Sequence, residues 1–152
     1  RASGEKHPTR RGRYVSRAHP RARSLEVAAV FEQKFFALVG NASGVAAVIG
    51  DRFYPGLAPQ GVTRPYCVYT RVASDPQNSL GGFTGNLERV RVQVDCYAET
   101  FDSAVAIAAA VRAAVDAGGT GIKGVCINEQ DAYENDPRLF RRMVEFSVFH
   151  RS

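Results

Sequence analysis

The stretch that decides the fold runs from residue 87 to residue 118 and reads LERVRVQVDCYAETFDSAVAIAAAVRAAVDAG. In residues 87–98 apolar and polar side chains alternate, and a period of two is typical of a strand with one buried face. The buried face is expected to hold Val90, Val92, Val94 and Cys96, and the polar face Arg89, Arg91, Gln93 and Asp95. At Glu99 this period ends, so the strand is expected to stop there.

After Glu99 the apolar residues recur at the spacing of a helix. The recurring positions are Ala104, Ile107, Ala108, Val111 and Val115. Thr100 can cap the first turn, and Gly118 provides the stop. Because the apolar side chains of this helix are mostly small, it can lie close to a sheet. We therefore expect a strand that runs directly into a helix folded back over it, with Val94 and Ile107 buried on the two sides of the seam.

The remaining patterns predict one further long helix and three further strands. The expected helices are 25–39 and 100–117, with a short helical turn at 45–49, and the expected strands are 65–73, 87–98, 123–134 and 138–150. Val125, Ile127 and Asp131 are expected to share one face of the third strand. The predicted class is α+β: a four-stranded, mainly antiparallel sheet with two main helices packed on one face.

Composition separates the chain into a basic arm and a nearly neutral body. The 152 residues are 45% hydrophobic and 23% charged, which is typical of one globular domain, here 24–152. Residues 1–23 contain eight of the 20 Lys and Arg and one of the 15 Asp and Glu, which gives this arm a net charge of +7. The remaining twelve basic and fourteen acidic residues give the rest of the chain a net charge of −2. Residues 1–23 have too few apolar side chains to order and are predicted to be a flexible arm.

The arm has two interpretations. Clustered arginines can bind nucleic acid by releasing counterions from phosphates, which would make the protein a nucleic-acid-binding module. The arm can equally be a solubilising tail, or upstream sequence that is not part of the native start. No apolar run approaches the roughly 20 residues that span a bilayer, so no membrane partner is expected, and no signal peptide is apparent.

The sequence offers no recognisable catalytic constellation. A nucleophile–base pair needs a histidine near Ser or Cys, and only His150 lies outside the arm. Asp131 and Glu134 could be imagined as a paired acid site, but acids at a strand end are usually solvated. The cysteines are Cys67, Cys96 and Cys126, widely spaced and without a CxxC pair, so we expect buried thiols rather than zinc ligands or disulfides. We expect no catalytic, cofactor or metal site; a small enzyme remains an alternative, and it would show a deep pocket lined by perturbed acids.

Protein contacts are the more plausible use of the surface. The aperiodic segment 74–86 is long for a hairpin loop, and the Phe53-Tyr54-Pro55 turn either contacts a partner or folds onto the core. The polar sheet face mixes charges with large apolar groups, as protein interfaces do. The candidate interface residues are Phe53, Tyr54, Pro55, Leu80, Gly81, Gly82, Phe83, Arg89, Arg91 and Arg141. Asp95 is expected to pair with Arg91 or Arg141, worth about 0–1 kcal/mol at a surface.

Three segments together resemble the phage tail completion proteins, the tail terminator or head–tail joining proteins of long-tailed phages and related gene transfer agents. They are RPYCVYTRV (64–72), RVRVQVDCYAETFDSAVAIAAAVRAAV (89–115) and DAYENDPRLFRRMVEFSV (131–148). Their shared features are the strand ending in Asp95, Tyr97 and Ala98, the alanine-rich helix, and the turn containing Asp131, Tyr133 and Glu134. The resemblance covers roughly 25–149, and the arm before Ser24 departs from the usual family start.

The resemblance implies a structural virion protein, made in the bacterial cytoplasm and placed at the head–tail junction. It implies a homohexameric ring that terminates the tail tube and joins it to the head connector. The expected partners are further copies of the chain, the tail tube protein and the head–tail connector protein, while DNA passes through without specific binding. We expect the polar sheet face to meet the first helix or the 53–55 turn of the next copy. Leu80 and Phe83 are expected to anchor the 74–86 loop in a neighbouring ring, and the alternative is a floppy hairpin tip without a partner.

Overall fold

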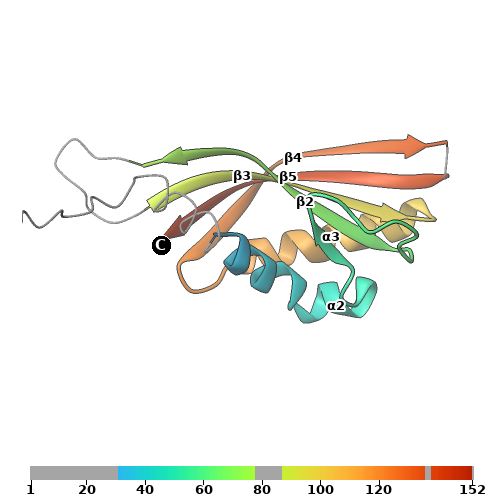
Figure 1. Ribbon diagram of the computed structural model, residues 1–152, viewed down its shortest axis with the longest axis horizontal. Coiled ribbons are helices and arrows are strands. Elements are labelled where there is room, and N and C mark those ends of the chain that lie inside the picture. Colours follow the sequence, from blue (N-terminus) through green and yellow to red (C-terminus); the bar gives the residue numbers. More distant parts are fainter. Residues whose placement is uncertain (1–30, 78–86, 136–137, 152) are drawn as a thin grey trace, which may run out of the picture.

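The computed structural model describes residues 31–77, 87–135 and 138–151, and it shows one twisted sheet with helices on a single face (Figure 1). Helical residues 31–40 come first. The labelled elements are α2 (Ser43–Ile49), β1 (Phe53–Pro55), β2 (Tyr66–Pro76), β3 (Leu87–Ala98), α3 (Phe101–Ala117), β4 (Ile122–Glu134) and β5 (Leu139–Arg151). The α+β class is therefore as predicted, and the four long strands fall within a few residues of their expected limits.

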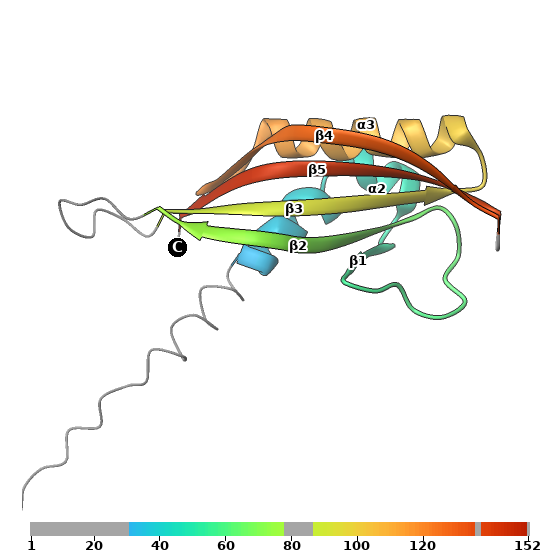
Figure 2. The same cartoon turned by 90° about the horizontal axis from the view of Figure 1, so that it is seen from above.

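The sheet has five strands in the order β1-β2-β3-β5-β4, so the prediction of four was one short. β2, β3, β5 and β4 pair antiparallel, whereas β1 lies parallel to β2 and makes the sheet mixed (Figure 2). Residues 53–55, expected as a turn, pair with 67–69. A strand of three residues is too short to show any period, so sequence patterns could not reveal it.

The strand-to-helix transition at Glu99 is confirmed. Thr100 caps α3, since its Oγ1 accepts a hydrogen bond from the Ser103 amide at 3.2 Å. Val94 and Ile107 are both fully buried, as expected of the seam between sheet and helix. The helix lies closest to the sheet at Gly124 of β4, where a Cβ added to the glycine would stand only 2.6 Å from Val115 Cγ1.

A second part of the core is aromatic. Phe35 of the first helix lies 5.4 Å, centroid to centroid, from Tyr69 of β2. Tyr69 in turn stacks on Phe53 of β1 at 4.8 Å. Phe31 stacks on Phe35 at 5.8 Å, and all four rings are buried. This cluster holds β1 and the first helix against the sheet. Phe53 is therefore part of the core of its own chain.

The prediction that Val125, Ile127 and Asp131 share one face of β4 was wrong, because Val125 is level with Ser147 and Asp131 is level with Arg142, on opposite faces of the sheet. Val125 and Ile127 are 53% and 48% exposed, and the buried positions are Ile122 and Gly124 instead. Val125 is level with Ser147 on the face that carries no helix, and a bulge between Cys126 and Asn128 interrupts the register. The reason is the close approach of α3, because only glycine fits under Val115 at position 124.

Candidate functional site

The face of the sheet opposite the helices, here called the outer face, carries the arginines singled out by the sequence. Alternation along β3 and β5 places Arg89, Arg91 and Arg141 together on this face. Arg89 Nη2 lies 2.7 Å from Asp75 Oδ2, and Arg91 pairs with Glu145. Each therefore has a carboxylate partner on a neighbouring strand of its own chain, so the charge of the outer face is largely balanced.

Arg142 belongs to the other face. It forms a two-pronged ion pair with Asp131, at 2.6 and 2.8 Å, and its guanidinium lies 5.6 Å from the centroid of Phe101 in α3. The hydrogen bond from Arg142 lowers the pKa of Asp131 against the smaller opposing effect of burial. Arg89, Arg91, Arg141 and Arg142 therefore do not line one surface.

Asp95 is the most buried charge of the outer face, with 6% of the residue exposed. Arg141 Nε donates to its Oδ1 at 2.9 Å, and Gln93 Nε2 lies 3.1 and 3.0 Å from its two oxygens. The expected pairing with Arg141 is thus confirmed. Burial opposes the charged form of Arg141, but the hydrogen bond and charge of Asp95 outweigh it and raise the arginine pKa. Arg141 also lies 5.8 Å from the centroid of Tyr97.

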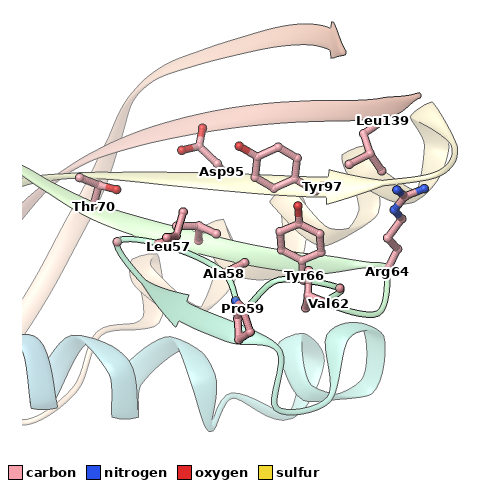
Figure 3. A pocket seen from close by; sticks show the side chains of 13 residues that line it. Leu57, Ala58, Pro59, Val62, Arg64, Tyr66, Thr70, Asp95, Tyr97 and Leu139 are labelled. Carbon is pink, nitrogen blue, oxygen red and sulfur yellow. The ribbon is translucent and has the colours of Figure 1, made fainter. Parts of the chain in front are cut away.

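A groove of about 360 Å³ lies beside Asp95 on this face (Figure 3). One wall is the segment 56–64, which leads from β1 to β2, and the floor is the outer face of β2 and β3. The rings of Tyr66 and Tyr97 stack across the two strands at 4.9 Å. The lining residues are Gly56, Leu57, Ala58, Pro59, Gly61, Val62, Arg64, Tyr66, Val68, Thr70, Asp95, Tyr97 and Leu139.

The lining of the groove holds few titratable groups. Its one carboxylate, Asp95, is already engaged by Arg141 and Gln93, and no histidine or cysteine is among the lining residues. Burial, the leading cause, raises the pKa of Tyr66, so its hydroxyl stays protonated. Leu57 stands 84% exposed at the wall. The groove therefore combines an exposed leucine and two stacked tyrosines with the polar side chains of Arg64, Thr70 and Asp95.

One buried group of polar residues lies on the helix side. His150 is fully buried, and its Nδ1 lies 3.7 Å from Glu88 Oε2, while Glu88 also pairs with Arg71. The ring of His150 meets Phe31 edge-on at 5.4 Å. Burial is the main cause that lowers the pKa of this histidine. His150 is thus enclosed between the sheet and Phe31, whereas the Arg71 and Glu88 side chains remain 24% and 13% exposed. Across the described ranges, no cluster of three or more His, Cys, Asp or Glu could hold a metal ion.

The expected interface residues divide into three groups. Phe53 is buried, Tyr54 is half-buried and Pro55 is exposed on the edge strand β1. The arginines at 89, 91 and 141 share the outer face, as alternation predicted. Leu80, Gly81, Gly82 and Phe83 lie outside the described residues, as does the arm 1–23 on which the nucleic-acid alternative depends. The groove was missed, because Leu57 in a Gly- and Pro-rich loop gives no sign of which strand the loop crosses.

The same arrangement of elements occurs in known proteins. The family model described as Tail completion protein gp17 matches residues 33–151. A solved structure titled "Virion of native gene transfer agent (GTA) particle" contains a chain with a TM-score of 0.63 and 16% identity. That match covers 83% of this chain and 98% of the other. No curated protein matches the chain. Among the described residues, no helix is long and apolar enough to cross a membrane.

Proposed function

This chain belongs to the family of Tail completion protein gp17, and from that premise we propose that it terminates the tail tube and joins it to the head connector as a ring of six copies. Family membership makes the chain a structural component of a virion, located at its tail. The observation that carries the finer proposal is a family match over nearly the whole described domain, 33–151, together with a sheet that leaves one face open.

Size and symmetry support the proposed ring. A subunit of 152 residues is too small to enclose a channel for duplex DNA alone. One contact that joins two different surfaces of the subunit, repeated about an axis, closes a ring without a second protein. The chain offers such different surfaces, because helices cover only one side of its sheet (Figure 1).

The charge distribution supports passage of DNA without specific binding. Unpaired arginines on a channel wall would hold phosphates by releasing counterions. On the outer face Arg89, Arg91 and Arg141 are each balanced by a carboxylate, and Arg142 is on the opposite face. The part of the chain after residue 23 carries a net charge of −2, so a ring built from it presents no strongly basic wall.

We assign the contact with the tail tube or connector protein to the groove and its surroundings. Leu57 is exposed at the rim, and the stacked Tyr66 and Tyr97 form the floor. Interfaces of this kind take most of their affinity from a few central aromatic and apolar side chains. Tyr54 and Pro55 lie at the edge of the same sheet, and Arg141 beside Asp95 adds a polar boundary.

The test combines particle mass with joining. The full chain is expected to have the mass of a hexamer in solution and to appear as an annulus by electron microscopy. Leu57→Asp is expected to leave the ring intact but to reduce joining of tails to heads at least tenfold. Ala109→Asp, which adds the same charge on the exposed side of α3, is the matched control and should join normally. A monomeric protein, or normal joining by Leu57→Asp, would contradict the proposal.

The segment 74–86 supplies a second test. The Gln77 amide donates a hydrogen bond to the Leu87 carbonyl at 3.0 Å. The pairing of β2 with β3 therefore does not depend on residues 79–84. Deleting 79–84 should therefore leave the domain folded and the ring formed, while joining fails. Particles that still assemble at the normal level would show that this loop does not reach a neighbouring ring.

A further inference from the structure

Among residues 31–77, 87–135 and 138–151, the sheet has two open edges, and they differ. β4 borders the sheet along its whole length, Ile122–Glu134. At the other border β1 covers only Cys67–Tyr69 of β2, so β2 is open from Thr70 to Pro76. We propose that these two edges pair with each other between neighbouring copies, so that β4 of one copy continues the sheet at residues 70–76 of the next. This inference rests on the proposed ring and names the contact that builds it.

Strand direction permits this pairing. β2, β3, β5 and β4 alternate in direction across the sheet, so β4 runs opposite to β2. Rotation about a ring axis that follows the strands preserves their directions. β4 of one copy would therefore meet β2 of the next as an antiparallel neighbour, the arrangement already used by every other long pair. The same rotation keeps all helices on one side of the ring wall and all outer faces on the other.

The register sets which residues would meet. Two rows of paired residues run across the sheet: Asp75, Arg89, Phe149 and Lys123 in one, and Ala73, Arg91, Ser147 and Val125 in the other. The proposed ring has its strands along the axis without tilt, because tilt would stagger the register, and copies at equal height then continue a row from one copy to the next. Lys123 then lies opposite Asp75 of the next copy, and Val125 lies opposite Ala73. Opposite charges and small apolar pairs in such positions stabilise a sheet.

The two edges also match in shape. β2 has an extra residue, Val72, between Arg71 and Ala73, and β4 has an extra residue, Ile127, between Cys126 and Asn128. Arg71 and Cys126 belong to one row, so the bulges stand at nearly the same height. Val72, Val125 and Ile127 are 49%, 53% and 48% exposed. Exposed apolar residues on a long open edge promote aggregation unless a partner covers them, and a copy of the same chain is the partner that fits both edges.

In this arrangement neighbouring copies touch through their sheet edges. The sequence pattern had instead predicted that the outer face makes this contact. With this pairing the outer face stays uncovered within the ring, and the groove at Leu57 remains free for another protein. A β4–β4 pair about a two-fold axis would instead stop at a dimer and leave the β2 edge open. The two arrangements differ in which residues come into contact.

Cysteine cross-linking of the full chain distinguishes them. Ala73→Cys with Val125→Cys, in a Cys126→Ser background, places one thiol on each edge. Three strand spacings of about 4.8 Å separate these positions within one copy, too far for an internal disulfide. Oxidation with diamide should give a ladder of linked copies up to six on a non-reducing gel. The control is Arg91→Cys with Val125→Cys, which moves one thiol a single strand inward on the same row and should give no ladder.

The cross-linking results distinguish failure of edge pairing from failure of the ring itself. Rings that form without a ladder, a ladder from the control pair, or a dimer linked through Val125→Cys alone would each overturn edge pairing and leave the ring function standing. Absence of any ring in the unmodified protein would overturn the proposed function and this contact with it. Lys123→Asp gives an independent reading, because it faces Asp75 of the next copy and should convert rings to monomers at concentrations where Lys123→Arg stays assembled. Equal assembly of these two variants would refute the pairing.

Discussion

Replacing Gly124 by alanine tests the packing on which the whole fold depends. A methyl group at this position would stand 2.6 Å from Val115 Cγ1, 3.1 Å from Val148 Cγ2 and 3.3 Å from the Ser147 carbonyl oxygen. Normal carbon contacts are about 3.5–4.0 Å, so the first contact is short by roughly 1 Å. Val115 and Val148 are both fully buried, so neither side chain can turn out into solvent.

The expected cost follows from two opposing terms. Overpacking a tight core costs about 1–3 kcal/mol, whereas replacing a strand glycine by alanine gains roughly 0.5–1 kcal/mol of backbone entropy. We expect Gly124→Ala to lower the free energy of unfolding by about 1–2 kcal/mol. Urea denaturation followed by circular dichroism, at one fixed protein concentration, measures this. Gly44→Ala is the control: a Cβ there meets nothing within 4 Å, so that variant should be neutral or slightly more stable.

A double-mutant cycle isolates the contact. Val115→Ala removes two methyl groups from a buried site, which should cost about 2–3 kcal/mol. In the double variant, the new methyl at 124 occupies space that Val115 has vacated. The two changes together should therefore cost at least about 1 kcal/mol less than the sum of the single changes. A Gly124→Ala variant as stable as the parent, or additivity within about 0.3–0.5 kcal/mol, would refute the close approach of α3 to β4.

Three further predictions follow from the core and the outer face. Ile107→Ala should lower the free energy of unfolding by about 2–5 kcal/mol, and a change within about 0.5 kcal/mol would mean that α3 turns another face to the sheet. Stability should fall as pH drops below the ordinary His150 pKa of 6.5, because the unfolded chain then binds a proton that the folded chain resists; His150→Gln should flatten this dependence in thermal melts at pH 8 and 5.5. Asp95→Asn should cost about 1–3 kcal/mol by weakening the hydrogen bond from Arg141, and an unchanged denaturation midpoint would show that this pair contributes nothing.

The candidate site could be anticipated only in part. Alternation along two strands predicted that Arg89, Arg91 and Arg141 would share a face, because side-chain direction in a strand is a local property. Their carboxylate partners come from neighbouring strands, and Asp75 and Glu145 are far from them in sequence. The strand order β1-β2-β3-β5-β4 decides which strands are neighbours, and it therefore decides which charged side chains can pair.

The amino-acid pattern alone determined the central unit of the fold. In residues 87–118 a period of two changes to a helical period, and both periods follow from backbone geometry within a few residues. Only the tertiary structure decided β1, the facing of β4 and the groove. Three residues carry no period, and Gly124 has no side chain to mark it as a core position. Residues 53–55 form a strand because they pair with residues 67–69 while Phe53 packs on Tyr69, and Val125 faces outward because Val115 of α3 occupies the space above Gly124.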